Sequence, residues 1–123
     1  MSTSVSICLA DILNDGKPGV VEKSARVSPG DSVAFTLAAD ARGRYSFKGA
    51  DSRSVTVTSV RPSSVSLTEA QAYLTGTVSG DYDTVTIAVS ANAVLCTINC
   101  NLRIKMPDGN HKSFDPLIDV IPR

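Results

Sequence analysis

The amino-acid sequence predicts an all-β protein, an antiparallel sandwich of about seven to nine short strands. Three observations lead to this prediction. Residues 94–106 alternate between apolar and polar side chains, which is the period of a strand with one buried face. Other short alternating segments are separated by turn residues at intervals of roughly 8 to 12 positions. Serine, threonine and valine are abundant, as strands and turns require, and tryptophan is absent.

The 94–106 segment carries the clearest of these patterns. Its even positions are apolar throughout, namely Val94, Cys96, Ile98, Cys100, Leu102, Ile104 and Met106. The odd positions from Thr97 to Lys105 are all polar. We therefore expect one long strand that lies with its apolar face on the core.

The length and the charge of the chain restrict its class. A chain of 123 residues fits a single domain, residues 1–123, and can bury roughly two thirds of its unfolded surface. Twelve basic residues balance twelve acidic ones, so we expect no nucleic acid partner and no attraction to anionic membranes. No apolar run approaches the ~20 residues that span a bilayer.

The N-terminus lacks a basic start and Asp11 interrupts its apolar patch, which argues against a secretory signal and predicts a cytoplasmic protein.

The N-terminal third contains three candidate strands. Val5, Ile7 and Leu9 alternate with polar or small residues and predict the first strand. A turn is expected over 14–19, followed by a strand to Val27. Lys23 interrupts the apolar face of that second strand, which is typical of a protected sheet edge.

The third strand follows Pro29-Gly30, a tight turn, and buries Val33, Phe35 and Leu37. The stretch Pro-Gly-Asp-Ser-Val resembles the beginning of the second core strand in immunoglobulin-like domains. That resemblance implies an immunoglobulin-like β-sandwich. The cysteine–tryptophan–cysteine pattern of antibody domains is missing, so an antigen-receptor domain is not expected.

The middle of the chain alternates in shorter pieces. Strands are expected around Tyr45 and Phe47, and around Val55 and Val57. Ser66 and Glu69 have the spacing of a capping box and could begin a helical turn, although we favour a strand from about Ala72.

The C-terminal third should contain two more strands beside the long one. Alternation over residues 84–90 predicts a strand that forms a hairpin with 94–106. A turn at 107–110 then leads to a last strand. Pro116 and Pro122 cannot donate to a ladder, so this strand should lie at an edge or be very short.

The chain contains three cysteines, Cys8, Cys96 and Cys100. The last two are about 13 Å apart on a regular strand, too far for a disulfide or for shared ligation of zinc. Two interpretations stay open. Either Cys96 and Cys100 are small core residues and the cysteines are free thiols in a reducing compartment, or Cys8 forms a bridge with one of the other two.

Few residues are candidates for chemistry, and we predict no catalytic, cofactor-binding or metal-binding residues. His111 is the only histidine and lies in a turn sequence, and no nucleophile motif is present, so we expect a protein that is not an enzyme. Calcium in oxygen-rich loops is the remaining alternative, with two groups of carboxylates: Asp81 and Asp83, and Asp108, Asp115 and Asp119. Three tyrosines are expected to be exposed and could contact a protein or a sugar, although tyrosines of a sandwich are usually partly buried: Tyr45, Tyr73 and Tyr82.

The C-terminal segment Ser-Phe-Asp-Pro-Leu-Ile-Asp-Val-Ile-Pro, residues 113–122, resembles the end of the DP-EP family. These are small, uncharacterised bacterial immunoglobulin-like sandwiches. Ile121 stands where that family carries an acidic residue. The resemblance implies a non-enzymatic bacterial sandwich and assigns no functional residues.

Together these observations predict a non-enzymatic immunoglobulin-like structural or protein-interaction module. Its expected partner is another protein or a second copy of itself, reached through loops or an edge strand. The alternative is a module that binds carbohydrate or calcium through loops at the end of the sandwich.

Overall fold

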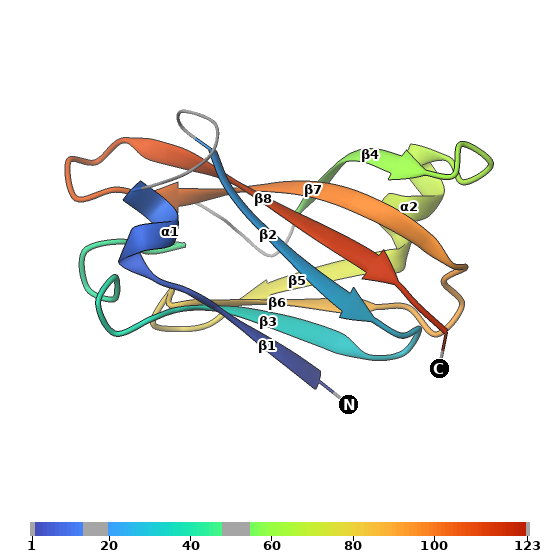
Figure 1. The fold of residues 1–123 in the computed structure, drawn as a ribbon, viewed down its shortest axis with the longest axis horizontal. Helices are drawn as coiled ribbons and strands as arrows, with labels where there is room; N and C mark the ends of the chain where they lie inside the picture. The colour runs from blue at the N-terminus through green and yellow to red at the C-terminus, as the bar shows by residue number, and fades with distance from the viewer. Residues whose placement is uncertain (1, 14–19, 48–54, 123) are drawn as a thin grey trace.

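The computed structural model describes residues 2–13, 20–47 and 55–122. Two four-stranded sheets pack face to face, so the predicted all-β sandwich is confirmed (Figure 1). The elements, in chain order, are β1 (Ser2–Ile7), α1 (Leu9–Leu13), β2 (Val20–Val27), β3 (Ser32–Leu37), β4 (Thr56–Arg61), α2 (Leu67–Tyr73), β5 (Leu74–Val78), β6 (Thr84–Val89), β7 (Cys96–Lys105) and β8 (His111–Val120). The turn expected over 14–19 lies outside the described residues.

We call the two sheets A and B. Sheet A has the strand order β1-β3-β6-β5, and sheet B has the order β2-β8-β7-β4. The inner pairings are antiparallel, but β1 lies parallel to β3 and β2 lies parallel to β8. The first two strands therefore occupy corresponding edges of the two sheets. The edge position expected for the strand with Lys23 is confirmed.

The long strand is confirmed as β7, in which buried residues alternate with half-buried or exposed ones from Cys96 to Lys105. The expected hairpin with the preceding strand is wrong, because β6 belongs to sheet A and β7 to sheet B. The chain crosses between the sheets before Cys96, which leaves Val94 47% and Leu95 53% exposed. The apolar alternation of the sequence thus begins before the strand does.

The last strand differs most from expectation. β8 is ten residues long and lies between β2 and β7, in the interior of sheet B. Pro116 interrupts the ladder only toward β7, and the register continues unchanged on both sides of it. At this gap Asn101 Nδ2 donates to Asp115 Oδ1 at 2.6 Å, so a side-chain hydrogen bond joins the strands where a backbone bond is missing.

Two short helices interrupt the strands. The capping box is confirmed: Ser66 Oγ accepts from the backbone of Glu69, whose side chain accepts in return, and α2 begins at Leu67. The strand therefore starts at Leu74 rather than Ala72.

Helix α1 was not expected, since Leu9 continued the alternation of the first strand. Its sequence signal is Asp11, whose carboxylate accepts from the backbone N–H of Cys8 at 2.9 Å.

Aromatic packing joins the two sheets. Phe114 of β8 meets Phe35 of β3 edge-to-face, with ring centroids 5.2 Å apart, and Phe47 at 6.1 Å. All three side chains are fully buried. The strand expected around Tyr45 and Phe47 is reduced to isolated bridges, such as the one between Ser46 and Lys105. Its two aromatic side chains nevertheless face the core as an alternating strand would require.

Candidate functional site

The candidate residues from the sequence do not come together. His111 is exposed at the start of β8, beside the turn that it was expected to occupy. Asp108 accepts hydrogen bonds from Asn110, two residues later, within that turn. Within residues 2–13, 20–47 and 55–122, no three His, Cys, Asp or Glu side chains are grouped so that they could hold a metal ion.

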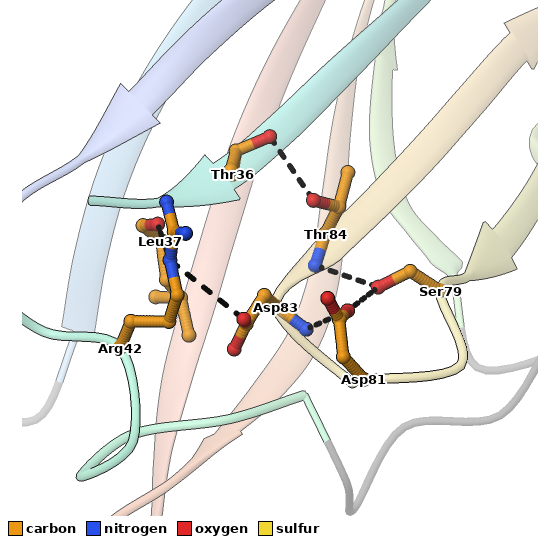
Figure 2. A network of polar contacts seen from close by, with 7 residues as sticks. All are labelled: Thr36, Leu37, Arg42, Ser79, Asp81, Asp83 and Thr84. Atoms are coloured by element: carbon orange, nitrogen blue, oxygen red, sulfur yellow. Dashed lines mark hydrogen bonds and ion pairs between the residues drawn. The ribbon is translucent and has the colours of Figure 1, made fainter. Parts of the chain in front are cut away.

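The turn between β5 and β6 contains the other proposed calcium ligands, and its carboxylates are engaged in contacts of the fold (Figure 2). Asp81 Oδ1 accepts from Ser79 Oγ at 2.5 Å and from the Asp83 N–H at 3.1 Å. The hydrogen bond from Ser79 is the main reason that the pKa of Asp81 is lowered. Ser79 Oγ in turn accepts from the Thr84 N–H, so this network closes the turn.

Asp83 and Tyr82 attach the same turn to the segment that follows β3. Arg42 Nε lies 3.7 Å from Asp83 Oδ2 and donates to the Leu37 carbonyl at 3.4 Å, as Figure 2 shows. The Tyr82 carbonyl accepts from the Phe47 N–H at 2.8 Å. Tyr82 has a φ of 60°, a strained conformation for a tyrosine. The contacts of Asp83 and of the Tyr82 carbonyl hold the turn on two sides. The tertiary structure therefore keeps Tyr82 in its strained conformation.

The three tyrosines that could have formed a contact surface are not all exposed. Tyr45 is only 7% exposed, so its expected exposure is wrong. Tyr73 is half-buried at the end of α2, and Tyr82 is 39% exposed in the β5–β6 turn.

All three cysteines are free thiols. Cys96 and Cys100 are buried on the core face of β7. Burial, with a smaller effect of Asp115, raises the pKa of Cys100 to about 12. Burial also raises the pKa of Cys96. The raised pKa values disfavour the thiolates that nucleophilic chemistry requires.

The edge of sheet B at β4 is partly covered by a side chain of α2. At β4, the Gln71 side chain donates through Nε2 to the Val55 carbonyl and accepts through Oε1 from the Val57 N–H, both at 2.9 Å. This amide of α2 pairs with the backbone just as a neighbouring strand would. A register shift between Val57 and Ser59 further distorts the edge.

At the opposite edge of sheet B, an ion pair joins β2 to helix α1. Lys23 Nζ lies 2.9 Å from Asp11 Oδ2, and both side chains are about a quarter exposed. Partial burial acts to raise the pKa of Asp11, but Lys23 and the hydrogen bonds from Cys8 outweigh it and lower that pKa. Lys112 Nζ donates to the Ile12 carbonyl and attaches the helix to β8. Charge and the helix therefore protect this edge.

Strand β1, at the edge of sheet A, differs from both edges of sheet B. The sequence of β1 contains no charged residue and no proline. The Ile7 carbonyl accepts from the Ala38 N–H, so the backbone groups of Ile7 point toward β3. Because successive residues of a strand point their backbone groups to opposite sides, those of Ser2, Ser4 and Ser6 point to the open edge.

The outer face of sheet A is also free of charge. The pairings of β1, β3, β6 and β5 place only serine, threonine and alanine on this face. The residues are Ser4, Ser6, Ser32, Ala34, Thr36, Thr84, Thr86, Ala88, Thr75 and Thr77. The corresponding face of β2, β8 and β7 in sheet B carries charged residues, including Arg26, Asp119 and Arg103.

A shallow hollow of about 270 Å³ opens between β2 and β8. It is lined by Ser24, Ala25, Arg26, Leu117 and Asp119. Asp119 Oδ1 accepts from Thr97 Oγ1 at 3.2 Å, and Asp119 Oδ2 lies 4.0 Å from Arg26 Nε. The polar groups of the hollow thus belong to a surface network that joins β2, β8 and β7. We assign no chemistry to it.

The comparisons with known proteins add no family assignment. Neither a scan against protein-family models nor a search of curated proteins returned a match for this chain. In the part of the chain that the structure describes, neither helix is long and apolar enough to cross a bilayer. A functional proposal for this protein therefore has to be based on the fold and on its open edge strand, β1.

Proposed function

We propose that this protein is a non-enzymatic, immunoglobulin-like interaction module that binds an extended polypeptide segment at the open edge of β1. The single observation behind the proposal is the contrast between the sheets. In sheet B the edge of β4 is paired with the Gln71 side chain of α2 and β2 carries a charged residue in an ion pair with α1, whereas in sheet A the backbone groups of Ser4 and Ser6 point outward from the uncharged strand β1. An unpaired, uncharged strand edge offers main-chain hydrogen bonds to an added strand.

The order of the strands supports the immunoglobulin-like part of this proposal. In immunoglobulin domains the second, fifth and fourth strands share one sheet and the third, sixth and seventh share the other. The same succession is found here as β3-β6-β5 and β4-β7-β8. The strands β1 and β2 divide between the sheets at their edges. Membership of the DP-EP family stays a prediction.

Strand addition can be tested with a library of extended peptides displayed on phage and selected on the wild-type protein. Ser4→Pro removes an outward N–H and leaves the ladder with β3 intact, because that N–H points away from β3. We expect selected peptides to bind Ser4→Pro at least about tenfold more weakly than wild type. Ser4→Ala keeps the N–H and should bind as wild type does. Peptides that bind all three proteins equally would contradict strand addition at β1.

We also propose that the protein functions in a reducing compartment. Support comes from the three free thiols, of which Cys96 and Cys100 lie on sheet B and Cys8 adjoins β1 of sheet A. Mass spectrometry after alkylation in denaturant without reductant should find all three cysteines modified in protein from its native host. An intrachain bridge from Cys8 would contradict this location.

A further inference from the structure

We propose that the strand that adds to β1 is β1 of a second copy of this chain, so that the module forms a two-fold symmetric dimer. This inference rests on the proposed function and identifies its partner.

The outward groups of β1 are complementary to themselves. In an antiparallel pair, opposite residues whose backbone groups face each other exchange two hydrogen bonds. With a two-fold axis at Ser4, Ser4 lies opposite its own counterpart and Ser2 lies opposite Ser6 of the second copy. Every outward N–H and C=O of β1 then acquires a partner. On the inner side Val5, which is half-buried, lies against Thr3 of the second copy.

The charge distribution permits identical copies to approach at this edge. β1 itself is uncharged, and its neighbours on the outer face of sheet A are serine, threonine and alanine. The whole chain carries twelve positive and twelve negative side chains. β1 therefore carries no charged side chain that would repel its counterpart in the second copy.

The second edge of sheet A, strand β5, is less suitable. The Ser79 N–H donates to Thr84 of β6, so by alternation the groups of Leu74, Gly76 and Val78 point outward. The Leu74 N–H is already used, because it donates to the Gln71 carbonyl at the end of α2. β1 therefore offers the longer run of open groups.

Pairing at β1 joins two four-stranded sheets into one continuous sheet. Contact along a single strand edge is smaller than the interface of a stable complex, which typically buries about 1,200–2,000 Å². We therefore expect a weak dimer with a dissociation constant on the order of 100 µM. Figure 1 shows β1 along the lower margin of the molecule, where a second copy could lie beside it.

Sedimentation equilibrium between about 10 µM and 1 mM tests the inference, since this range brackets the expected dissociation constant. The apparent mass of wild type and of Ser4→Ala should rise toward twice the mass of 12.9 kDa. At a total concentration of about 100 µM, where about half of the wild type should be dimeric, Ser4→Pro should be largely monomeric, because its dissociation constant is raised at least about tenfold. Circular dichroism and a melting curve will establish that the proline variant is folded.

A charge exchange keeps the test decisive even if Ser4→Pro does not fold. Ser4 is exposed and, in the proposed register, faces itself across the axis. Ser4→Lys alone and Ser4→Glu alone should each dimerise more weakly than wild type, because like charges then lie opposite each other. An equimolar mixture of the two variants should recover the dimer.

The outcomes separate the two proposals. Wild type that stays monomeric at 1 mM while selected peptides still bind at β1 overturns the dimer alone. The absence of both peptide binding and dimerisation overturns both proposals. A dimer that persists in Ser4→Pro, or a Lys and Glu mixture that stays monomeric, shows that association does not use β1 paired about Ser4.

Discussion

Replacing Phe114 by alanine should lower the free energy of unfolding by about 3–5 kcal/mol. The Phe114 ring is fully buried and packs against Phe35 from sheet A and against Phe47 from the segment after β3. Its removal takes apolar contacts from both sheets and leaves a cavity that the rigid strands can fill only in part. Denaturation in urea, followed by circular dichroism, measures the change.

Phe114→Leu is the matched control, because it keeps most of the buried volume and should cost only about 1–2 kcal/mol. A natural domain is stable by about 5–15 kcal/mol, so the alanine variant should unfold at a clearly lower urea concentration. If both variants lost less than about 1 kcal/mol, the three rings could not form the contact between the sheets.

The second large effect is a dependence of stability on alkaline pH that originates at Cys100. The pKa of this thiol is raised from an ordinary value of 9.0 to about 12, chiefly by burial. Between these values the unfolded chain releases the proton and the folded chain keeps it, so the unfolded state binds fewer protons. The free energy of unfolding therefore falls as pH rises from about 9 toward 12, by an amount on the order of a few kcal/mol.

The measurement is a series of urea denaturations at pH 8 to 11 for wild type and for Cys100→Ala. Other groups titrate in the same range, so the informative quantity is the difference between the two proteins. The alanine variant will be less stable at pH 8 because of its cavity, and this deficit should shrink as pH rises. A deficit that stayed constant up to pH 11 would mean that Cys100 ionises equally in both states.

The sequence predicted those features that depend on local periodicity. The alternation from Cys96 to Lys105 identified β7 because burial of one face imposes a period of two on the side chains. The spacing of Ser66 and Glu69 identified the start of α2 because a capping box involves only neighbouring residues. Both signals are complete within a short segment.

The errors concern contacts between distant segments. A loop of the same length can join two strands of one sheet or cross to the other, so the sequence could not show that β6 and β7 separate. Pro116 indicated an edge, yet the fold tolerates it in the interior because the missing bond affects only one ladder and Asn101 reaches Asp115 across it. Neither of these two reasons why Pro116 is tolerated can be recognised from the sequence of β8 alone, because both involve the neighbouring strand.

The candidate site was only partly predictable for the same reason. The lack of charge in Ser2–Ile7 can be read from the sequence, but the position of this strand at the edge of sheet A depends on the topology. Lys23 correctly indicated an edge strand. A charged side chain on the inner face of a strand must reach solvent, and it can do so at the edge of a sheet. A sequence can thus mark a protected edge more readily than an open one.

The pairing of Gln71 with the backbone of β4 has a consequence for chemical ageing. Hydrolysis of its side-chain amide to a carboxylate would replace the donor Nε2 by an oxygen that faces the Val55 carbonyl, and the two acceptors would repel each other. Deamidation of Gln71 would then expose the edge of sheet B at β4, at constant temperature and without denaturant. Storage of the protein under conditions that favour deamidation should therefore promote irregular aggregates, which differ from the two-fold symmetric dimer proposed at β1.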